Sequence, residues 1–204
     1  MEIRDILRKF TPIRTKKLII RKIRGSDAAQ MLKITSDYEL TKYLGWSPNK
    51  NIQEVNMAID RRLSEYKTGE TNRLILAIAD LDDRLIGNIA YKFSHNESIT
   101  CEIGYWIGRE YWNNGYGSEA LSACLKYGFE VLGLERIQCC CMPENIASWK
   151  VMEKSGMVFE GILRKSYYMN GRLYDDKIYS MLKDEYREKL YNVEAFFECQ
   201  KTRS

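Results

Sequence analysis

The sequence predicts an α+β fold: a mixed, mostly antiparallel sheet with a central parallel strand pair, flanked by helices. Three apolar runs between residues 73 and 108 are separated only by short polar turns, which is typical of antiparallel strands. A strand–helix–strand–helix order follows, and it implies one parallel pairing because the helix carries the chain back across the sheet. The dipeptide Asn170-Gly171 between two further apolar runs indicates a closing hairpin.

The length of the chain fits one domain. We expect its 204 residues to form a single unit, residues 1–204, with a core at about 15–185. A basic N-terminal arm would precede this core and a charged C-terminal tail would follow it. Apolar residues make up 45% of the chain and charged residues 29%, which is typical of globular proteins.

The first part of the chain predicts a strand and two helices. Residues 18–24 (LIIRKIR) form the strand, and Ser26 or Asp27 caps a helix that begins directly after it. Residues 37–50 contain glycine, proline and tryptophan, a composition that favours a loop. The second helix begins just after this loop and ends at Gly69, since glycine is common at helix C-termini.

The remaining elements follow from hydrophobic periodicity and turn residues. Strands are expected at residues 73–79, 85–93, 99–108 and 135–142, and helices at residues 115–132 and 145–155. Residues 157–168 and 173–182 form the closing hairpin. The charges of residues 183–204 balance, and this tail is either a terminal helix or frayed.

Positive charge is concentrated at the start of the chain. The net charge is +4, and residues 1–24 contain nine Lys or Arg against two acidic residues. Such an arm meets phosphates or an acidic partner, or forms a solvated edge; a net charge this small gives no argument for nucleic acid. No apolar run is long enough for a membrane span, and MEIRDILRKF lacks an apolar signal-peptide core. We therefore expect a cytoplasmic protein without a membrane or direct nucleic-acid partner.

Cysteine and histidine residues are poorly placed for metal binding. The six cysteines include three consecutive ones, Cys139–Cys141, whose side chains alternate between the two faces of a strand. No C-x-x-C pair occurs, and the single histidine, His95, lies in a polar turn, where an exposed histidine without a function is common. We expect no metal site, and we expect the thiols to be buried and reduced.

The run WNNGYGSEA at residues 112–120 carries the first functional signal. Gly115 and Gly117 open a helix that follows a strand, and the first turn of a helix offers unpaired N–H groups and the positive end of the helix dipole. These features suit a pyrophosphate, although glycines also occur at plain loop-to-helix junctions. A dinucleotide-binding turn fits less well, because six residues separate the strand from the glycines and only one parallel crossover follows.

Two longer runs, EIGYWIGREYWNNGYGSEAL and LERIQCCCMPENIASWKVMEKSGMVFEG, resemble the GNAT acetyl-CoA-dependent N-acetyltransferases. More narrowly, they are similar to the RimJ/RimL branch, which acetylates N-terminal amines of ribosomal proteins and includes relatives acting on small amines. The resemblance covers residues 15–185, and its element order agrees with the one predicted above. It implies that acetyl-CoA enters a V-shaped gap between the strands at residues 99–108 and 135–142.

The resemblance also implies which residues hold acetyl-CoA. The pantetheine arm would pair like an added strand with the strand edge at Trp106 and Ile107, and Asn145 would hydrogen-bond this arm. The pyrophosphate would lie on the backbone of Asn113, Asn114, Gly115, Tyr116, Gly117 and Ser118.

Acetyl transfer to an amine needs a group that accepts the proton of the ammonium. Glu102 is our candidate base, because strand alternation places it on the face shared with Trp106 and opposite Cys101 and Ile103. We expect this carboxylate to lie beside an apolar ring and to act directly or through a water. A structural or solvated glutamate is the alternative.

The departing thiolate needs a proton or a hydrogen bond. Ser148 lies three residues after Asn145 on one helix face and matches the N-x-x-S pattern of RimL-like proteins, so its hydroxyl would donate to the sulfur. Hydrogen bonding to its own helix is the alternative. The chain departs from the wider family at Met152, where many members carry a tyrosine as general acid; a water, Tyr167 or Tyr168 are other candidates for this role.

These observations predict an enzyme that transfers an acetyl group from acetyl-CoA to a primary amine by direct attack. The expected acceptor is a protein N-terminal α-amine of the ribosomal-protein type. A small amine such as an antibiotic, polyamine or amino acid is the first alternative. A non-catalytic acyl-CoA-binding module is the second, supported only by Met152. The oligomeric state, including a homodimer, stays open.

Overall fold

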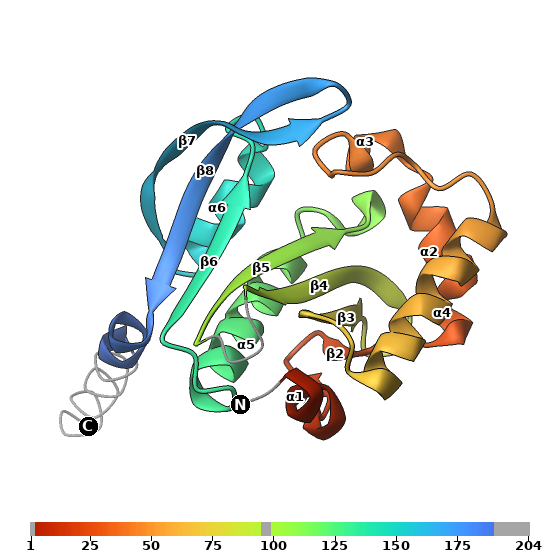
Figure 1. The fold of residues 1–204 in the computed structure, drawn as a ribbon, viewed down its shortest axis with the longest axis horizontal. Helices are drawn as coiled ribbons and strands as arrows, with labels where there is room; N and C mark the ends of the chain where they lie inside the picture. The colour runs from red at the N-terminus through yellow and green to blue at the C-terminus, as the bar shows by residue number, and fades with distance from the viewer. Residues whose placement is uncertain (1–2, 95–98, 190–204) are drawn as a thin grey trace, which may run out of the picture.

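An eight-stranded sheet forms the centre of the molecule, in the order β1-β2-β3-β4-β5-β6-β8-β7 (Figure 1). The computed structural model describes residues 3–94 and 99–189; His95 and most of the expected C-terminal tail lie outside them. The strands are β1 (Ile13–Arg14), β2 (Ile19–Lys22), β3 (Arg73–Ala79), β4 (Leu85–Phe93), β5 (Thr100–Ile107), β6 (Arg136–Cys141), β7 (Val158–Met169) and β8 (Arg172–Leu182).

Helices and short turns connect these strands. The helices are α1 (Ile3–Lys9), α2 (Ala28–Thr35), α3 (Tyr38–Thr41), α4 (Ile52–Thr68), α5 (Tyr116–Glu130) and α6 (Ile146–Lys154). The 3-10 turns are η1 (Gly25–Asp27) and η2 (Arg109–Tyr111), and residues 183–189 are also helical.

The predicted fold class is confirmed. Strands β5 and β6 pair in parallel, while every other neighbouring pair in the sheet is antiparallel. The predicted hairpin joins β7 and β8, and both of its turn residues, Asn170 and Gly171, have the positive φ that a tight two-residue turn requires.

Helices cover the two faces of the sheet unequally. Helix α5 packs Leu121 and Leu125 against one face, in a core that includes Ile103 of β5 and Ile137 of β6. Helices α2 and α4 cover the opposite face only over β3 and β4. In Figure 1 the front of β5 therefore lies between these two helices and the β7–β8 hairpin, with no helix in front of it.

The structure corrects two of the predictions, the one for the basic arm and the one for the loop at residues 37–50. Part of the arm is helix α1, whose Ile6 and Leu7, together with Phe10, are buried in the core, so the arm is more than a solvated edge. Its exposed arginines hide this amphipathic pattern in the sequence. Within residues 37–50, Asp37 caps the short helix α3 by accepting the N–H of Glu39 at 2.9 Å.

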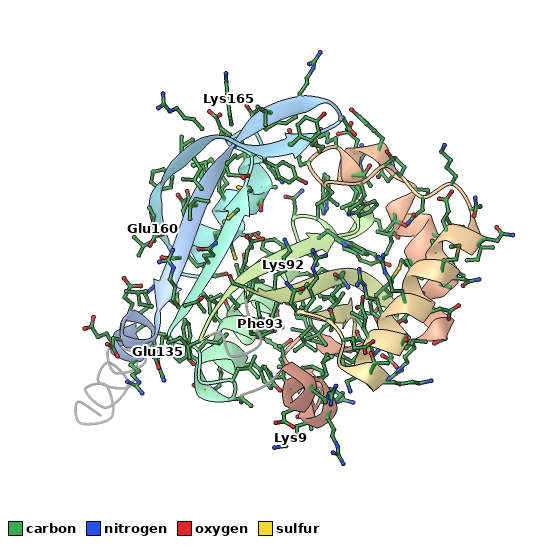
Figure 2. The ribbon with its side chains drawn as sticks, in the orientation of Figure 1. Lys9, Lys92, Phe93, Glu135, Glu160 and Lys165 are labelled. Carbon is green, nitrogen blue, oxygen red and sulfur yellow. The ribbon has the colours of Figure 1, made fainter. Side chains whose placement is uncertain are left out.

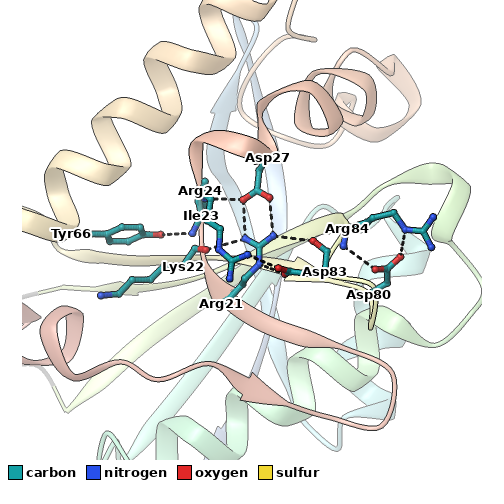
Figure 3. A network of polar contacts seen from close by, with 9 residues as sticks. All are labelled: Arg21, Lys22, Ile23, Arg24, Asp27, Tyr66, Asp80, Asp83 and Arg84. Atoms are coloured by element: carbon teal, nitrogen blue, oxygen red, sulfur yellow. Dashed lines mark hydrogen bonds and ion pairs between the residues drawn. The ribbon is translucent and has the colours of Figure 1, made fainter.

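A buried ion pair ties β2 to the start of α2 (Figure 3). The Arg21 guanidinium donates to both carboxylate oxygens of Asp27 at 2.8 and 2.9 Å, and both side chains are at most 5% exposed. Asp83, in the β3–β4 turn, also accepts from Arg21 and from Arg24. Because the network joins three segments, it fixes where α2, and with it α3, begins.

Replacing Asp27 tests this network. We expect Asp27→Ala to lower the free energy of unfolding by about 3–5 kcal/mol, because a buried guanidinium loses its bidentate partner. Urea titration at neutral pH measures the change. The control is Glu110→Gln, which breaks an exposed ion pair with Lys33 and should cost less than about 1 kcal/mol. Equal losses in the two variants would contradict a structural role for the buried pair.

Candidate active site

Two strands separate at the centre of the sheet. Strand β5 pairs with β6 at only three positions, the last of which joins Glu102 to Gln138. Beyond this point β5 stays with β4 as far as Ile107, while β6 stays with β8 as far as Cys141. The parallel pair therefore opens into a gap, at the place where the sequence predicts one.

A cavity of about 480 Å³ lies at the open end of this gap. Its walls come from the end of β5, the loop before α5, the first turns of α6, and residues 39–44. Of the residues expected to bind acetyl-CoA or act on it, the cavity is lined by Trp106, Ile107, Asn113, Gly115, Tyr116, Gly117, Ser118, Asn145 and Ser148. Asn114 is not among them, since its side-chain amide folds back onto the carbonyls of Tyr111 and Trp112.

The loop before α5 presents backbone N–H groups to the cavity. Asn113 and Gly115 both have positive φ, and α5 begins at Tyr116 directly after them. The first N–H groups of a helix have no acceptor within it, so those of Tyr116 to Ser118 can meet an anion. Two exposed cations on α6, Lys150 and Lys154, line the same cavity, and neither is in an ion pair within the described part of the chain.

The two glycines of this loop have different structural roles. At Gly115 the positive φ of 79° requires glycine, and an added Cβ would meet nothing within 4 Å. At Gly117 an added Cβ would lie 3.2 Å from the Val151 side chain of α6. Gly117 therefore permits close packing of α5 against α6, and it also lines the cavity, where it stays a predicted part of the pyrophosphate site.

Hydrogen bonds from the N-terminal segment hold the loop before α5 in place. One carboxylate oxygen of Glu119, in the first turn of α5, accepts from the Thr15 hydroxyl and from the Lys17 N–H, each at 2.7 Å. The Lys17 ammonium lies 3.2 Å from the Asn114 carbonyl and 5.9 Å from the ring centre of Tyr116. The basic arm thus brings a further cation to the loop.

The β5 edge is partly engaged by the protein itself. The Trp112 indole donates to the Ile107 carbonyl at 2.6 Å, so this acceptor is already used where we expected a pantetheine arm to pair. The side-chain oxygen of Asn145 caps α6 by accepting the Ser148 N–H at 3.2 Å. What Asn145 can offer a ligand is therefore its amide N–H₂ group.

Ser148 lies between a tyrosine and a cysteine. The Tyr105 hydroxyl lies 3.0 Å from the Ser148 carbonyl, to which it donates, and 3.3 Å from the Ser148 hydroxyl. Burial raises the pKa of Cys141 to about 11, and a hydrogen bond with Ser148 opposes this rise. Met152 is 1% exposed and belongs to the core. The contact between Tyr105 and Ser148 could not be predicted from the sequence, because no local spacing links a strand residue to a residue on α6.

Glu102 does not line the large cavity. It lines a separate hollow of about 190 Å³ together with Lys92, Arg136 and Gln138. The Lys92 ammonium lies 2.6 Å from one of its carboxylate oxygens, and the Cys140 thiol donates to the other at 3.7 Å. We expected an apolar ring beside Glu102; its nearest polar partner is this lysine, whose cross-strand position the sequence alone did not reveal. Figure 2 shows Lys92 near the middle of the open face.

The β7–β8 hairpin closes over this face. An added Cβ at Gly45, in the loop after α3, would lie only 2.4 Å from the Tyr167 hydroxyl, so hairpin and loop are in direct contact. Burial raises the pKa of Asp176 on β8, and the negative charge of Glu102 adds to this rise. The hydrogen bond from the Ser166 hydroxyl opposes it. The two carboxylates therefore belong to one electrostatic environment.

Residues 17–158 match the family model described as the acetyltransferase (GNAT) domain. The chain belongs to the GNAT acetyltransferase family. It is 34% identical to the uncharacterized N-acetyltransferase YoaA of Bacillus subtilis over 85% of this chain and 98% of that protein. It is also similar to the crystal structure of a GNAT-family acetyltransferase from Bacillus anthracis, with a TM-score of 0.75 and 30% identity, over 86% of this chain and all of the other.

Family membership makes this GNAT protein an acetyl-CoA-dependent N-acetyltransferase. The cavity fits such a ligand, since it combines a helix N-terminus, exposed cations and a gap between two strands. Among the described residues, no group of three or more His, Cys, Asp or Glu is placed to hold a metal ion. Within the same residues, no helix is long and apolar enough to cross a membrane.

Lysine substitutions test where the phosphates bind. We expect Lys150→Gln and Lys154→Gln each to weaken acetyl-CoA binding by about fivefold, as the loss of one exposed charge contact implies. The loss should shrink at high salt, because exposed charges are screened. Calorimetry at two salt concentrations measures both effects. Lys126→Gln, on α5 outside the cavity, is the control; equal affinity in all three variants would place the phosphates elsewhere.

Proposed function

We propose that this GNAT protein acetylates a protein N-terminal α-amine of the ribosomal-protein type by direct attack on acetyl-CoA. One observation carries the proposal: the gap between β5 and β6 has a cavity lined by a helix N-terminus and two lysines on one side and a carboxylate, Glu102, on the other. A thioester reaching into this gap would meet an amine arriving along the open front of β5.

Named relatives support an amine acceptor of either kind. Over 103 residues the chain is 29% identical to the ribosomal-protein-serine acetyltransferase of Escherichia coli. Over 170 residues it is 21% identical to the spermidine N(1)-acetyltransferase of Vibrio cholerae. The higher identity to the first relative, over half of this chain, supports a protein N-terminus, while the match to the second covers 83% of the chain and supports a small amine.

The proposed chemistry assigns a task to each side of the gap. Glu102, directly or through a water, takes the proton of the acceptor ammonium, and the free amine attacks the acetyl carbonyl carbon. Asn145 holds the pantetheine arm through its amide group, which fixes the thioester near the point where β5 and β6 separate. The Ser148 hydroxyl donates a hydrogen bond to the departing thiolate.

The contact between Tyr167 and Gly45 favours a second candidate, a small-molecule amine. This contact joins the β7–β8 hairpin to the loop after α3, in front of the face of β5 along which the acceptor would arrive. A bridged opening admits a small cation more easily than a long polypeptide. A peptide acceptor would thread only its first residues beneath the bridge.

Mass spectrometry of acetylated products tests the proposal. The enzyme is incubated with acetyl-CoA and a panel of N-terminal peptides and small amines, including a polyamine and free amino acids. We expect acetyl groups on peptide N-termini. Acetylation of small amines alone would replace the first candidate with the second. Binding of acetyl-CoA without any transfer would instead indicate a non-catalytic binding module.

Glu102 is tested through the pH dependence of turnover. We expect Glu102→Gln to lower kcat by about 10²- to 10⁴-fold near neutral pH, the usual contribution of a positioned base. The deficit should shrink at high pH, where the acceptor amine is already deprotonated. Glu110→Gln is the matched control, since this exposed carboxylate lies outside both cavities. A deficit that does not change with pH would remove Glu102 from the role of base.

A further inference from the structure

We infer that Tyr105 is a positioning residue for the leaving group: its hydroxyl and that of Ser148 form a two-member hydrogen-bond chain that ends on the sulfur of CoA. The inference rests on the proposed function, because it requires Ser148 to face the thioester. It adds a second residue, from a different element, to the group that stabilises the thiolate.

The geometry joins the two walls of the gap. Tyr105 comes from β5 and Ser148 from α6, and both line the large cavity. The phenol oxygen is 3.0 Å from the Ser148 carbonyl and 3.3 Å from the Ser148 hydroxyl oxygen. A single rotation about the phenol C–O bond therefore turns its proton from the carbonyl to the hydroxyl, without movement of either backbone.

Burial keeps the Tyr105 phenol neutral. Desolvation raises the pKa of Tyr105 well above its ordinary value, and the neighbouring thiols of Cys139 and Cys141 add to this rise. A phenol of this kind stays protonated at neutral pH, so it can donate a hydrogen bond but does not surrender its proton. The hydrogen-bond chain of Tyr105 and Ser148 therefore stabilises the charge on the sulfur by hydrogen bonding and not by proton transfer.

The leaving-group step balances on this basis. As the amine nitrogen bonds to the acetyl carbon, the C–S bond breaks and its electron pair stays on sulfur. The acceptor ammonium loses one proton to Glu102 or water before it attacks, and the attacking nitrogen loses its second proton to water as the neutral amide forms. The Ser148 hydroxyl donates to the sulfur anion and accepts from Tyr105. Hydrogen bonds to ionised acceptors are the stronger class, and a chain of hydroxyls polarises its members. The Tyr105 and Ser148 hydroxyls would supply the hydrogen-bond donor that Met152, in place of the family's tyrosine, does not provide.

Ligand affinity tests the inference without any acceptor. Calorimetry compares CoA with desulfo-CoA, which lacks the sulfur, between pH 7 and pH 9.5. A thiol ionises near the upper end of this range, so the wild type should increasingly prefer CoA as the pH rises. In Tyr105→Phe we expect about a tenfold loss of CoA affinity at high pH and unchanged affinity for desulfo-CoA.

The matched control is Tyr91→Phe. Tyr91 likewise donates its hydroxyl to a backbone carbonyl, that of Cys124 at 2.7 Å, but it is fully buried in the core and lines neither cavity. This variant should keep the wild-type preference for CoA at every pH. Equal loss of both ligands in Tyr105→Phe, or an unchanged preference for CoA, would overturn the inference.

Kinetics of the double variant give a second, independent test. If the two hydroxyls act as one chain, Tyr105→Phe combined with Ser148→Ala should lower kcat no further than Ser148→Ala alone. Additive losses would overturn the hydrogen-bond chain.

If Tyr105→Phe fails to fold, 3-fluorotyrosine at position 105 replaces it as the test. This residue keeps the shape of tyrosine and strengthens the donor, so CoA affinity at high pH should rise; no rise would count against the hydrogen-bond chain. Absence of turnover in the wild type with every amine would contradict the proposed function alone.

Discussion

The short register between β5 and β6 is the constraint on which the site depends. Three paired positions hold the strands parallel, and each strand then follows its other neighbour. Because β5 and β6 separate within the sheet, an extended ligand can enter between them, and their side chains are reached from both faces. The loop before α5 and helix α6 line the cavity at one side of this opening, while Glu102 lines the hollow at the other.

Contacts far from the gap hold its walls at the correct spacing. Glu119 attaches the N-terminal segment to the first turn of α5, and Gly117 lets α5 approach Val151 of α6. The Arg21–Asp27 pair fixes the beginning of α2, which leads into residues 39–44 of the cavity wall. The site therefore joins elements from nearly the whole length of the described chain. For this reason the glycine motif before α5 describes only a small part of it.

Much of this arrangement follows from the sequence, and the rest depends on tertiary contacts. Periodicity and turn residues predicted the sheet and the principal helices, and the glycine motif predicted the loop before α5. Helix α1 was missed because arginines surround its few buried residues. The pairing of Glu102 with Lys92 depends on the β4–β5 register, and the contact of Tyr105 with Ser148 depends on how α6 packs on β5; neither is encoded in local spacing. In the proposed function the acceptor meets the face under Tyr167, which no motif describes.

Hydrogen–deuterium exchange in the presence of CoA tests most directly whether the gap between β5 and β6 is the ligand site. The measurement follows backbone amides over the whole chain with and without CoA, and it needs no knowledge of the acceptor. Binding in the gap predicts slower exchange in residues 103–107, in residues 113–118 and in the first turn of α6, with little change in β2 and β3. Protection confined to other segments, or none at saturating CoA, would contradict the account.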